Sequence, residues 1–197
     1  MYALELGGQD DAFAVREARS AATGVERVAP GLATADSLSD RIRGLAYTHR
    51  ASELLGQCDP DVESARTLLA AAAIDRTGSV AVRAEDVRGR TGVDTQRAEA
   101  VLGQVLVDRG FAVDLTSPDH ELRALFGEGT ALVGWLTAES VRDFGQRRPT
   151  DKPFFQPGSM DPLLARALAN LAGARPGATI LDPMCGTGGI LVEAGLV

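Results

Sequence analysis

One segment near the end of the chain, residues 178–195, constrains the fold more than any other stretch. It reads ATILDPMCGTGGILVEAG. The apolar run that ends at Asp182 predicts a buried strand, and the apolar residues after Gly189 predict the first turns of a helix. Glycines at positions 186, 188 and 189 let the backbone approach a ligand closely, and a helix start offers unpaired N–H groups. The segment therefore indicates the strand, loop and helix of a nucleotide-type cofactor pocket.

Several cofactor loops share this glycine-rich character. A phosphate-binding P-loop requires a lysine after its glycine, and the only lysine of the chain, Lys152, lies well upstream. The dinucleotide fingerprint requires a glycine where Leu191 stands. What remains is a strand that ends in Asp182, and a carboxylate there suits a ligand with an ammonium group and hydroxyls. S-adenosylmethionine has both, and a tight strand-to-helix turn without a ligand is the alternative.

Composition narrows the class of protein. With 197 residues, of which 45% are hydrophobic, the chain is globular and forms one or two domains. A net charge of -7 argues against indiscriminate nucleic-acid binding, so we expect no DNA partner. The longest aliphatic run, residues 68–74, is too short to span a bilayer, and the first residues lack the basic region of a signal peptide. The chain has only two cysteines and two histidines, scattered singly, so we expect a cytoplasmic protein with no disulfide framework and no metal site. The sequence does not predict an oligomeric state.

Strands and helices mix through residue 140, which is typical of one or two α+β modules. Asp59 is placed to cap one helix and Asp94 to precede another, which Gly110 would end. The expected elements are strands at 2–6 and within 26–35 around a helix at 11–22, a strand or strand–helix pair within 41–55, a helix at 60–74, a strand at 79–86, a helix from 95, a strand at 111–115, and a hairpin of 121–126 and 131–136 with a four-residue loop.

The composition changes at residues 146–162, QRRPTDKPFFQPGSMDP, which hold four prolines. Proline cannot donate a backbone hydrogen bond and restrains the residue before it to extended geometry. We therefore expect an extended, semi-rigid linker. Asp161 and Pro162 then open a helix that closes near Gly173, and residues 178–182 form the strand described above.

Four stretches carry a resemblance to a known family: RP at 148–149, KPFFQPGSM at 152–160, LARALANLA at 164–172 and LDPMCGTGGILVEA at 181–194. They closely resemble the archaeal THUMP-domain tRNA (guanine-N(2))-methyltransferases, which modify the exocyclic amine of guanosine at tRNA position 10. Residues 79–148 are similar to the family's THUMP domain through VAVR at 80–83 and VDL at 113–115. Residues 1–57 fit its first domain by position and by LAYTH at 45–49.

The resemblance implies a fold and a domain plan. It predicts an α+β ferredoxin-like domain at 1–57, a THUMP RNA-binding domain at 58–145, a linker at 146–160, and at 161–197 the start of an α/β Rossmann-like class I methyltransferase domain. It implies S-adenosylmethionine as cofactor and tRNA as partner. The implied cofactor contacts fall in two segments, namely Phe155 and Pro157 in the first, and Asp182, Pro183, Cys185, Gly186, Thr187, Gly188 and Gly189 in the second.

One feature of the family is missing from these residues. The catalytic motif that the resemblance implies is Asp or Asn followed by Pro-Pro-Tyr, and the chain has no Pro-Pro pair. No catalytic residue is therefore assigned, and we expect the chain to be the first portion of such an enzyme, cut just after the cofactor loop and inactive alone. The alternative function is a THUMP-type tRNA-binding module without catalysis.

Arginines are the candidate RNA contacts. Arg83, Arg88 and Arg90 follow a predicted strand into a glycine-containing turn, and Arg147 and Arg148 begin the linker. Such side chains could bind phosphates, and a solvated face of mixed charge is the alternative. The sequence also predicts that Trp135 belongs to the core and that Cys185 is a small packing residue with no nucleophilic role.

Overall fold

The computed structural model describes residues 1–151 and 156–197. Its first part folds from the predicted strand and helix, followed by four short strands, a 3-10 helix and one long strand. In order, these elements are β1 (Tyr2–Leu6), α1 (Asp11–Ala18), β2 (Ala22–Thr23), β3 (Glu26–Ala29), β4 (Leu32–Ala35), β5 (Ser37–Leu38), the 3-10 helix η1 (Asp40–Gly44) and β6 (Thr48–Cys58).

The middle part adds two helices and four strands. They are α2 (Val62–Ala71), β7 (Ser79–Asp86), the 3-10 turn η2 (Val87–Gly89), α3 (Thr95–Asp108), β8 (Ala112–Val113), β9 (His120–Gly127) and β10 (Thr130–Glu139). Both helices begin at an aspartate whose carboxylate accepts a backbone N–H of the first turn: Asp61 from Ser64, and Asp94 from Arg97. The apolar side chains Ala98, Leu102 and Leu106 form the buried face of α3.

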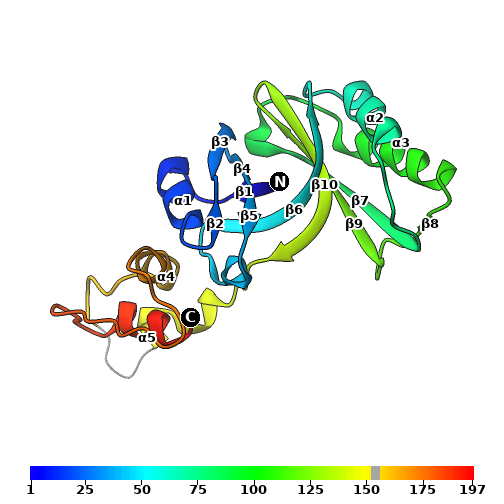
Figure 1. The fold of residues 1–197 in the computed structure, drawn as a ribbon. Coiled ribbons are helices and arrows are strands. Elements are labelled where there is room, and N and C mark those ends of the chain that lie inside the picture. The colour runs from blue at the N-terminus through cyan, green and yellow to red at the C-terminus, as the bar shows by residue number, and fades with distance from the viewer. Residues whose placement is uncertain (152–155) are drawn as a thin grey trace.

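One mixed sheet joins these two parts. Eight strands follow in the order β3-β4-β1-β6-β10-β9-β7-β8, and a separate ribbon pairs β2 with β5. The long strand β6 pairs with β1 on one side and with β10 on the other, so it belongs to both parts (Figure 1). All pairings in the large sheet are antiparallel except those of β7, which runs parallel to β8 and β9.

Side chains alternate between the two faces of this sheet. The first face carries Leu4 and Leu6 of β1 under α1, and Leu122 and Phe126 of β9 under α2 and α3. The opposite face buries Leu32 of β4 in the same cluster as residues of β9 and β10. Since three strands separate β4 from β9 in the sheet, the sheet must curl for these strands to touch, and Figure 1 shows the bend in β6 and β10.

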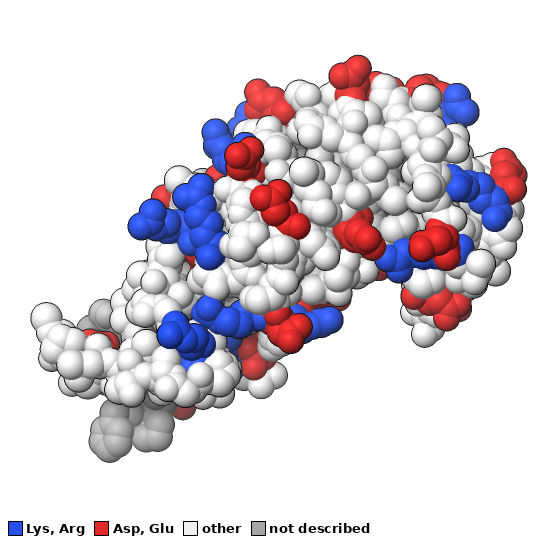
Figure 2. Space-filling model, in the orientation of Figure 1, with Lys and Arg blue, Asp and Glu red and all other residues white. Residues whose placement is uncertain are grey.

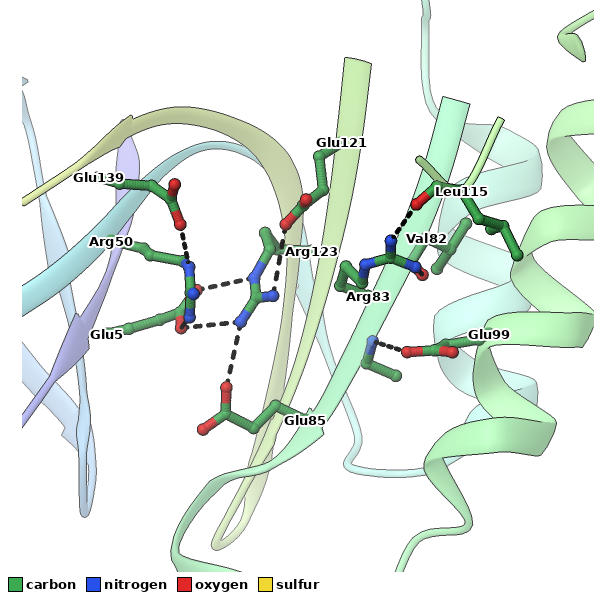
Figure 3. Close-up of polar contacts among 11 residues, drawn as sticks. Glu5, Arg50, Val82, Arg83, Glu85, Glu99, Leu115, Glu121, Arg123 and Glu139 are labelled. Carbon is green, nitrogen blue, oxygen red and sulfur yellow. Dashed lines mark hydrogen bonds and ion pairs between the residues drawn. The ribbon is translucent and has the colours of Figure 1, made fainter. Parts of the chain in front are cut away.

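A buried ion-pair network lies on this inner face (Figure 3). Arg123 of β9, 7% exposed, donates to both carboxylate oxygens of Glu5 at 2.9 and 2.8 Å and to Glu85 at 3.1 Å. Arg50 of β6 lies 3.5 Å from Glu5 and forms a second ion pair with Glu139. Burial raises the pKa of Glu5 even though the charge of Arg123 lowers it. The network links β1 and β6 to β9 and β7 across the inner face of the curled sheet.

The last part of the chain is helical. After β10 come the 3-10 turns η3 (Phe144–Arg147) and η4 (Pro149–Asp151), then α4 (Pro162–Leu171) and α5 (Gly189–Gly195). Asp161 caps α4 and Pro162 stands in its first turn, as predicted. These helices pack on each other at one end of the molecule, beside α1 (Figure 1).

Glu17 of α1 joins this helical part to the sheet. Its buried carboxylate accepts the backbone N–H groups of Ala46 and Tyr47, each at 2.7 Å, and the side-chain amide of Asn170 in α4, also at 2.7 Å. Asn170 donates in addition to the carbonyl oxygen of Gly44 at 3.1 Å. One buried acid thus holds α4 against α1 and the chain before β6.

Several predicted elements differ from the structure. The strand expected at 178–182 is irregular, and Leu181 is 86% exposed; no other strand of the described chain lies beside it to supply hydrogen bonds. The first helix ends at Ala18, four residues early, and the strand at 111–115 shrinks to two residues. The expected extended linker contains the two 3-10 turns within 144–151.

Two predicted turns also change. The hairpin loop has two residues instead of four, because Gly127 and Thr130 still pair and Gly129 turns with a φ of 77°. The cap of α2 is Asp61, not Asp59, since its carboxylate receives both the N–H and the hydroxyl of Ser64. Trp135 is buried as predicted, at 2% exposed, whereas Cys185 is exposed and does not pack.

Candidate cofactor and RNA sites

The predicted glycine loop lines a cavity together with a segment that precedes α4. The cavity measures about 190 Å³. The lining residues come from two stretches, Gln156, Pro157, Gly158, Ser159 and Met160 in the first, and Asp182, Met184, Cys185, Gly186, Thr187, Gly189 and Ile190 in the second. Pockets that enclose a drug-sized ligand usually measure about 300–1,000 Å³, so these residues enclose only part of a nucleoside cofactor.

A hydroxyl pair joins the two stretches. Ser159 Oγ and Thr187 Oγ1 lie 3.1 Å apart, and Ser159 Oγ also donates to the carbonyl oxygen of Gln156 at 2.7 Å. Gly189 lies next to Met160, because a Cβ on this glycine would be 3.8 Å from the Met160 Cβ. The first stretch therefore lies directly over the glycine loop.

The conformation of the glycine loop explains its composition. Gly186 and Gly188 have φ angles of 50° and 75°, in the left-handed region that favours glycine. Gly188 is also the N-cap of α5. A Cβ on either glycine would meet nothing within 4 Å, so the backbone angle and not crowding demands glycine here. Asp182 Oδ1 accepts the backbone N–H of Met184 at 3.0 Å and so shapes the start of the loop.

An ion-pair cluster anchors α5 beneath this loop. Glu193, 2% exposed, pairs with Arg147 of η3 at 2.7 Å and with Arg166 of α4 at 2.9 Å. Arg147 also pairs with Asp143 at 2.7 Å, and the side-chain hydrogen bonds that Arg147 donates to Asp143 and Glu193 raise its pKa. The guanidinium of Arg147 lies over the ring of Phe144. The cluster ties the glycine loop to the chain that leaves β10.

Most of the sequence-predicted cofactor contacts therefore meet at one place. Pro157, Asp182, Cys185, Gly186, Thr187 and Gly189 line the cavity; Gly188 and Pro183 belong to the same loop without lining it, and Phe155 lies outside the described residues. Six lining residues were not among the predicted contacts: Gln156, Gly158, Ser159, Met160, Met184 and Ile190. Their neighbours in sequence were selected, but nothing in the pattern revealed which side chains turn inward.

The five candidate RNA-binding arginines have different surroundings. Arg83 donates to the carbonyl oxygen of Leu115 at 2.8 Å, and Arg88 forms an ion pair of 3.0 Å with Asp11 of α1. Arg90 and Arg148 are exposed, whereas Arg147 belongs to the buried cluster with Glu193. The structure does not gather them into one patch, and Figure 2 shows basic and acidic side chains interspersed on the viewed face.

Arg88 has a structural explanation. It is the one non-glycine residue with a positive φ, 63°, among those described. Its side chain lies over Gly31, where a Cβ would come within 2.9 Å of the Arg88 Nε. Asp11 binds both the Arg88 guanidinium and the backbone N–H of Gly31, so it closes η2 onto the β3–β4 hairpin.

Comparisons with known proteins agree with this geometry. Residues 149–197, which include the whole cavity, match the family model of the RMKL-like methyltransferase domain. The tRNA (guanine(10)-N2)-dimethyltransferase of Methanothermobacter thermautotrophicus is 41% identical over 158 residues, which cover 78% of this chain and 46% of that protein. The chain thus spans about half the length of this relative.

Solved structures show the same fold. The crystal structure of TrmN from Thermus thermophilus aligns with a TM-score of 0.60 and 25% identity, over 99% of this chain and 61% of that one. SMU.472, a putative methyltransferase complexed with SAH, aligns with a TM-score of 0.56 and 14% identity, over 99% of this chain and 54% of that one.

Among the described residues, no helix has the length and apolar character needed to cross a membrane. The chain is therefore related by sequence to the tRNA (guanine-N2)-methyltransferases, and its fold is that of TrmN over nearly its whole length.

Proposed function

We propose that this chain acts in S-adenosylmethionine-dependent methylation of tRNA, on the exocyclic amine of a guanosine. The observation that carries the proposal is the cavity between residues 156–160 and 182–190. It lies wholly within the stretch that matches a methyltransferase domain, and it is built around the glycine loop. The relative with 41% identity is named for the guanine at position 10 of tRNA, and we propose the same target here. We propose a cytoplasmic location for this activity.

The loop residues have distinct roles in this proposal. Gly186, Gly188 and Gly189 allow the backbone to lie against the cofactor, because no side chain intervenes. Asp182 uses one carboxylate oxygen within the loop, and a carboxylate can accept further hydrogen bonds from an ammonium or hydroxyl group of the cofactor. Pro157, Pro183, Cys185 and Thr187 would complete the wall, and the same role is proposed for Phe155. SMU.472 was solved with SAH, the demethylated product of such a cofactor.

RNA recognition is assigned to the curled sheet. We propose a ferredoxin-like domain at 1–57 and a THUMP domain at 58–145, joined through residues 146–160 to a methyltransferase domain that begins at 161. The continuity of the sheet through β6 supports rigid coupling of the first two domains. We propose phosphate contacts for four exposed or partly exposed arginines: Arg83, Arg88, Arg90 and Arg148. Arg147 could bind a phosphate only after its ion pair with Glu193 breaks.

Transfer of a labelled methyl group tests the function. The protein is incubated with methyl-labelled S-adenosylmethionine and a tRNA transcript, and the digested nucleosides are separated. The proposal expects N2-methylguanosine when the gene product extends through a catalytic motif, and its loss when position 10 is changed to adenosine. Binding of tRNA without any methyl transfer by the whole gene product would instead support the tRNA-binding module without catalysis.

A further inference from the structure

A second, polar cavity lies where the sheet meets the helical part, away from the glycine loop. It measures about 160 Å³ and is lined by His49 and Arg50 of β6, Glu139 at the end of β10, and Ser140 and Arg142 just beyond. The backbone N–H of Ser140 donates to the carbonyl oxygen of His49 at 2.9 Å, which holds the two strands together at this point. The proposed function gives this cavity no role.

Two of its groups, Ser140 and Arg142, form no hydrogen bond or ion pair with another side chain of the described residues. Ser140 is 8% exposed, and its buried Oγ has no hydrogen-bond partner within the described part of the chain. The Arg142 guanidinium donates to a carbonyl oxygen, that of Ala46, instead of a carboxylate. An unpartnered buried hydroxyl costs free energy that a bound anion would recover. The exposed Arg142 guanidinium, which lies over the Phe144 ring and is attracted by Glu17 without a direct ion pair, can bind the same anion.

The surroundings of His49 are positive as well. Burial lowers the pKa of His49, and the charges of Arg142, Arg50 and Arg88 lower it further, while Glu85 opposes them. The imidazole is therefore neutral near pH 7 and can share a hydrogen bond with an anion. The Arg50 charge is already divided between Glu139 and Glu5 (Figure 3), so Arg142 supplies the main attraction.

We propose that this cavity binds one phosphate group of an RNA backbone, held by Arg142, Ser140 and His49. The volume suits a single phosphate and is too small for a whole nucleotide ligand. The rim is open, since the side chains of Glu139 and Arg50 are 55% and 36% exposed, so a polymer can present its backbone there. The choice of RNA over free phosphate rests on the proposed function.

Histidine-selective NMR tests the anion site directly, because the chain has two histidines. His120 bonds to the carbonyl oxygen of Thr77 and does not line the cavity, so it is an internal control. At pH 7 and constant ionic strength, replacing chloride with inorganic phosphate should shift the His49 signals and leave those of His120 in place. Unmoved His49 signals would overturn the proposal.

One variant tests the bound phosphate, and a second tests whether that phosphate belongs to RNA. Ser140→Ala should fold as wild type and weaken phosphate binding about tenfold, because the buried hydroxyl has no other partner. The matched control is Ser20→Ala, since the Ser20 Oγ is also buried and unpartnered but lies outside the cavity.

Arg142→Gln should lower the slope of log tRNA affinity against log salt by about one, whereas Arg97→Gln, at a side chain 64% exposed, should not.

The outcomes separate the possible sources of the phosphate. A His49 shift together with the reduced slope supports the RNA phosphate site. A His49 shift with an unchanged slope in Arg142→Gln would show a site for free phosphate and overturn the RNA assignment. Failure of methyl transfer with these two results intact would count against the proposed function alone, because neither measurement uses the cofactor.

Discussion

The hydroxyl oxygens of Ser159 and Thr187 lie 3.1 Å apart and join two segments separated by 28 residues of sequence. The first segment precedes α4 and the second belongs to the glycine loop. Their contact makes one cavity from two stretches that would otherwise be separate turns. We expect the cofactor to bind across this contact.

Ser159→Ala removes the hydroxyl pair without changing the backbone. We predict a three- to tenfold loss of S-adenosylmethionine affinity, because one hydrogen bond contributes about 0.5–1.5 kcal/mol. Calorimetric titration measures the loss. Ser37→Ala is the matched control, since Ser37 forms a similar pair with Thr23, at 2.6 Å, on the β2–β5 ribbon. Equal effects of the two variants would contradict a role for Ser159 in the site.

Gly188→Ala introduces a side chain at a φ of 75°. We predict that it destabilises the start of α5 by about 1–2 kcal/mol, because the left-handed region penalises any Cβ. Hydrogen exchange of the α5 amides should speed up accordingly. In Gly103→Ala, within α3, the new methyl group meets nothing within 4 Å, so this variant should be neutral or stabilising.

Glu193→Gln removes the buried charge between Arg147 and Arg166. We predict a loss of about 3–5 kcal/mol in the docking of α5 on α4, because two arginines are left without their shared partner. Amide hydrogen exchange should speed up in α5 and the glycine loop and stay unchanged in the sheet. Arg66→Gln breaks an exposed pair with Glu63 and should cost no more than about 1 kcal/mol.

The charge of Glu17 makes stability depend on pH. Burial raises the pKa of this carboxyl above 4.5, although hydrogen bonds from Ala46, Asn170 and Tyr47 offset part of the effect. The folded state therefore holds the proton more tightly than the unfolded state. The corresponding stabilisation is complete below about pH 4.5 and is lost as the pH rises through the folded pKa.

Glu17→Gln removes this proton equilibrium. We predict that the stability of the variant relative to wild type improves between pH 4.5 and pH 7, by about 1.4 kcal/mol for each unit by which the pKa is raised. Urea unfolding at several pH values measures the difference. A relative stability that is constant or falls over this range would contradict the buried-acid account of the α1–α4 contact.

Patterns of neighbouring residues predicted those strands and helix starts whose formation depends mainly on neighbouring residues. Strands β1 and β7 begin and end at the predicted residues, since alternating apolar side chains determine them. The start of α4 follows from the Asp161-Pro162 pair. The strand at 178–182 failed because a strand needs hydrogen-bonding neighbours, which no local pattern provides.

In the candidate site, too, the sequence predicted the local feature but not the contacts between distant residues. The sequence predicted the glycine loop from its conformational needs, and the structure places that loop at a cavity. It could not predict the Ser159–Thr187 contact or the pairing of Arg147 with Glu193, 46 residues away, because both depend on how α4 and α5 pack. The polar cavity at His49 was also beyond reach, since its residues come from separate strands.

The most direct test of the account is an amide NMR titration of the protein with S-adenosylmethionine. Chemical-shift changes are expected only at residues 155–160 and 182–190, with weak binding, because a cavity of about 190 Å³ encloses only part of the cofactor. Adenosine triphosphate, added as a control, should leave the glycine loop unshifted. Shifts located elsewhere, or no shift at saturating cofactor, would contradict the assignment of this loop as the methyl-donor site.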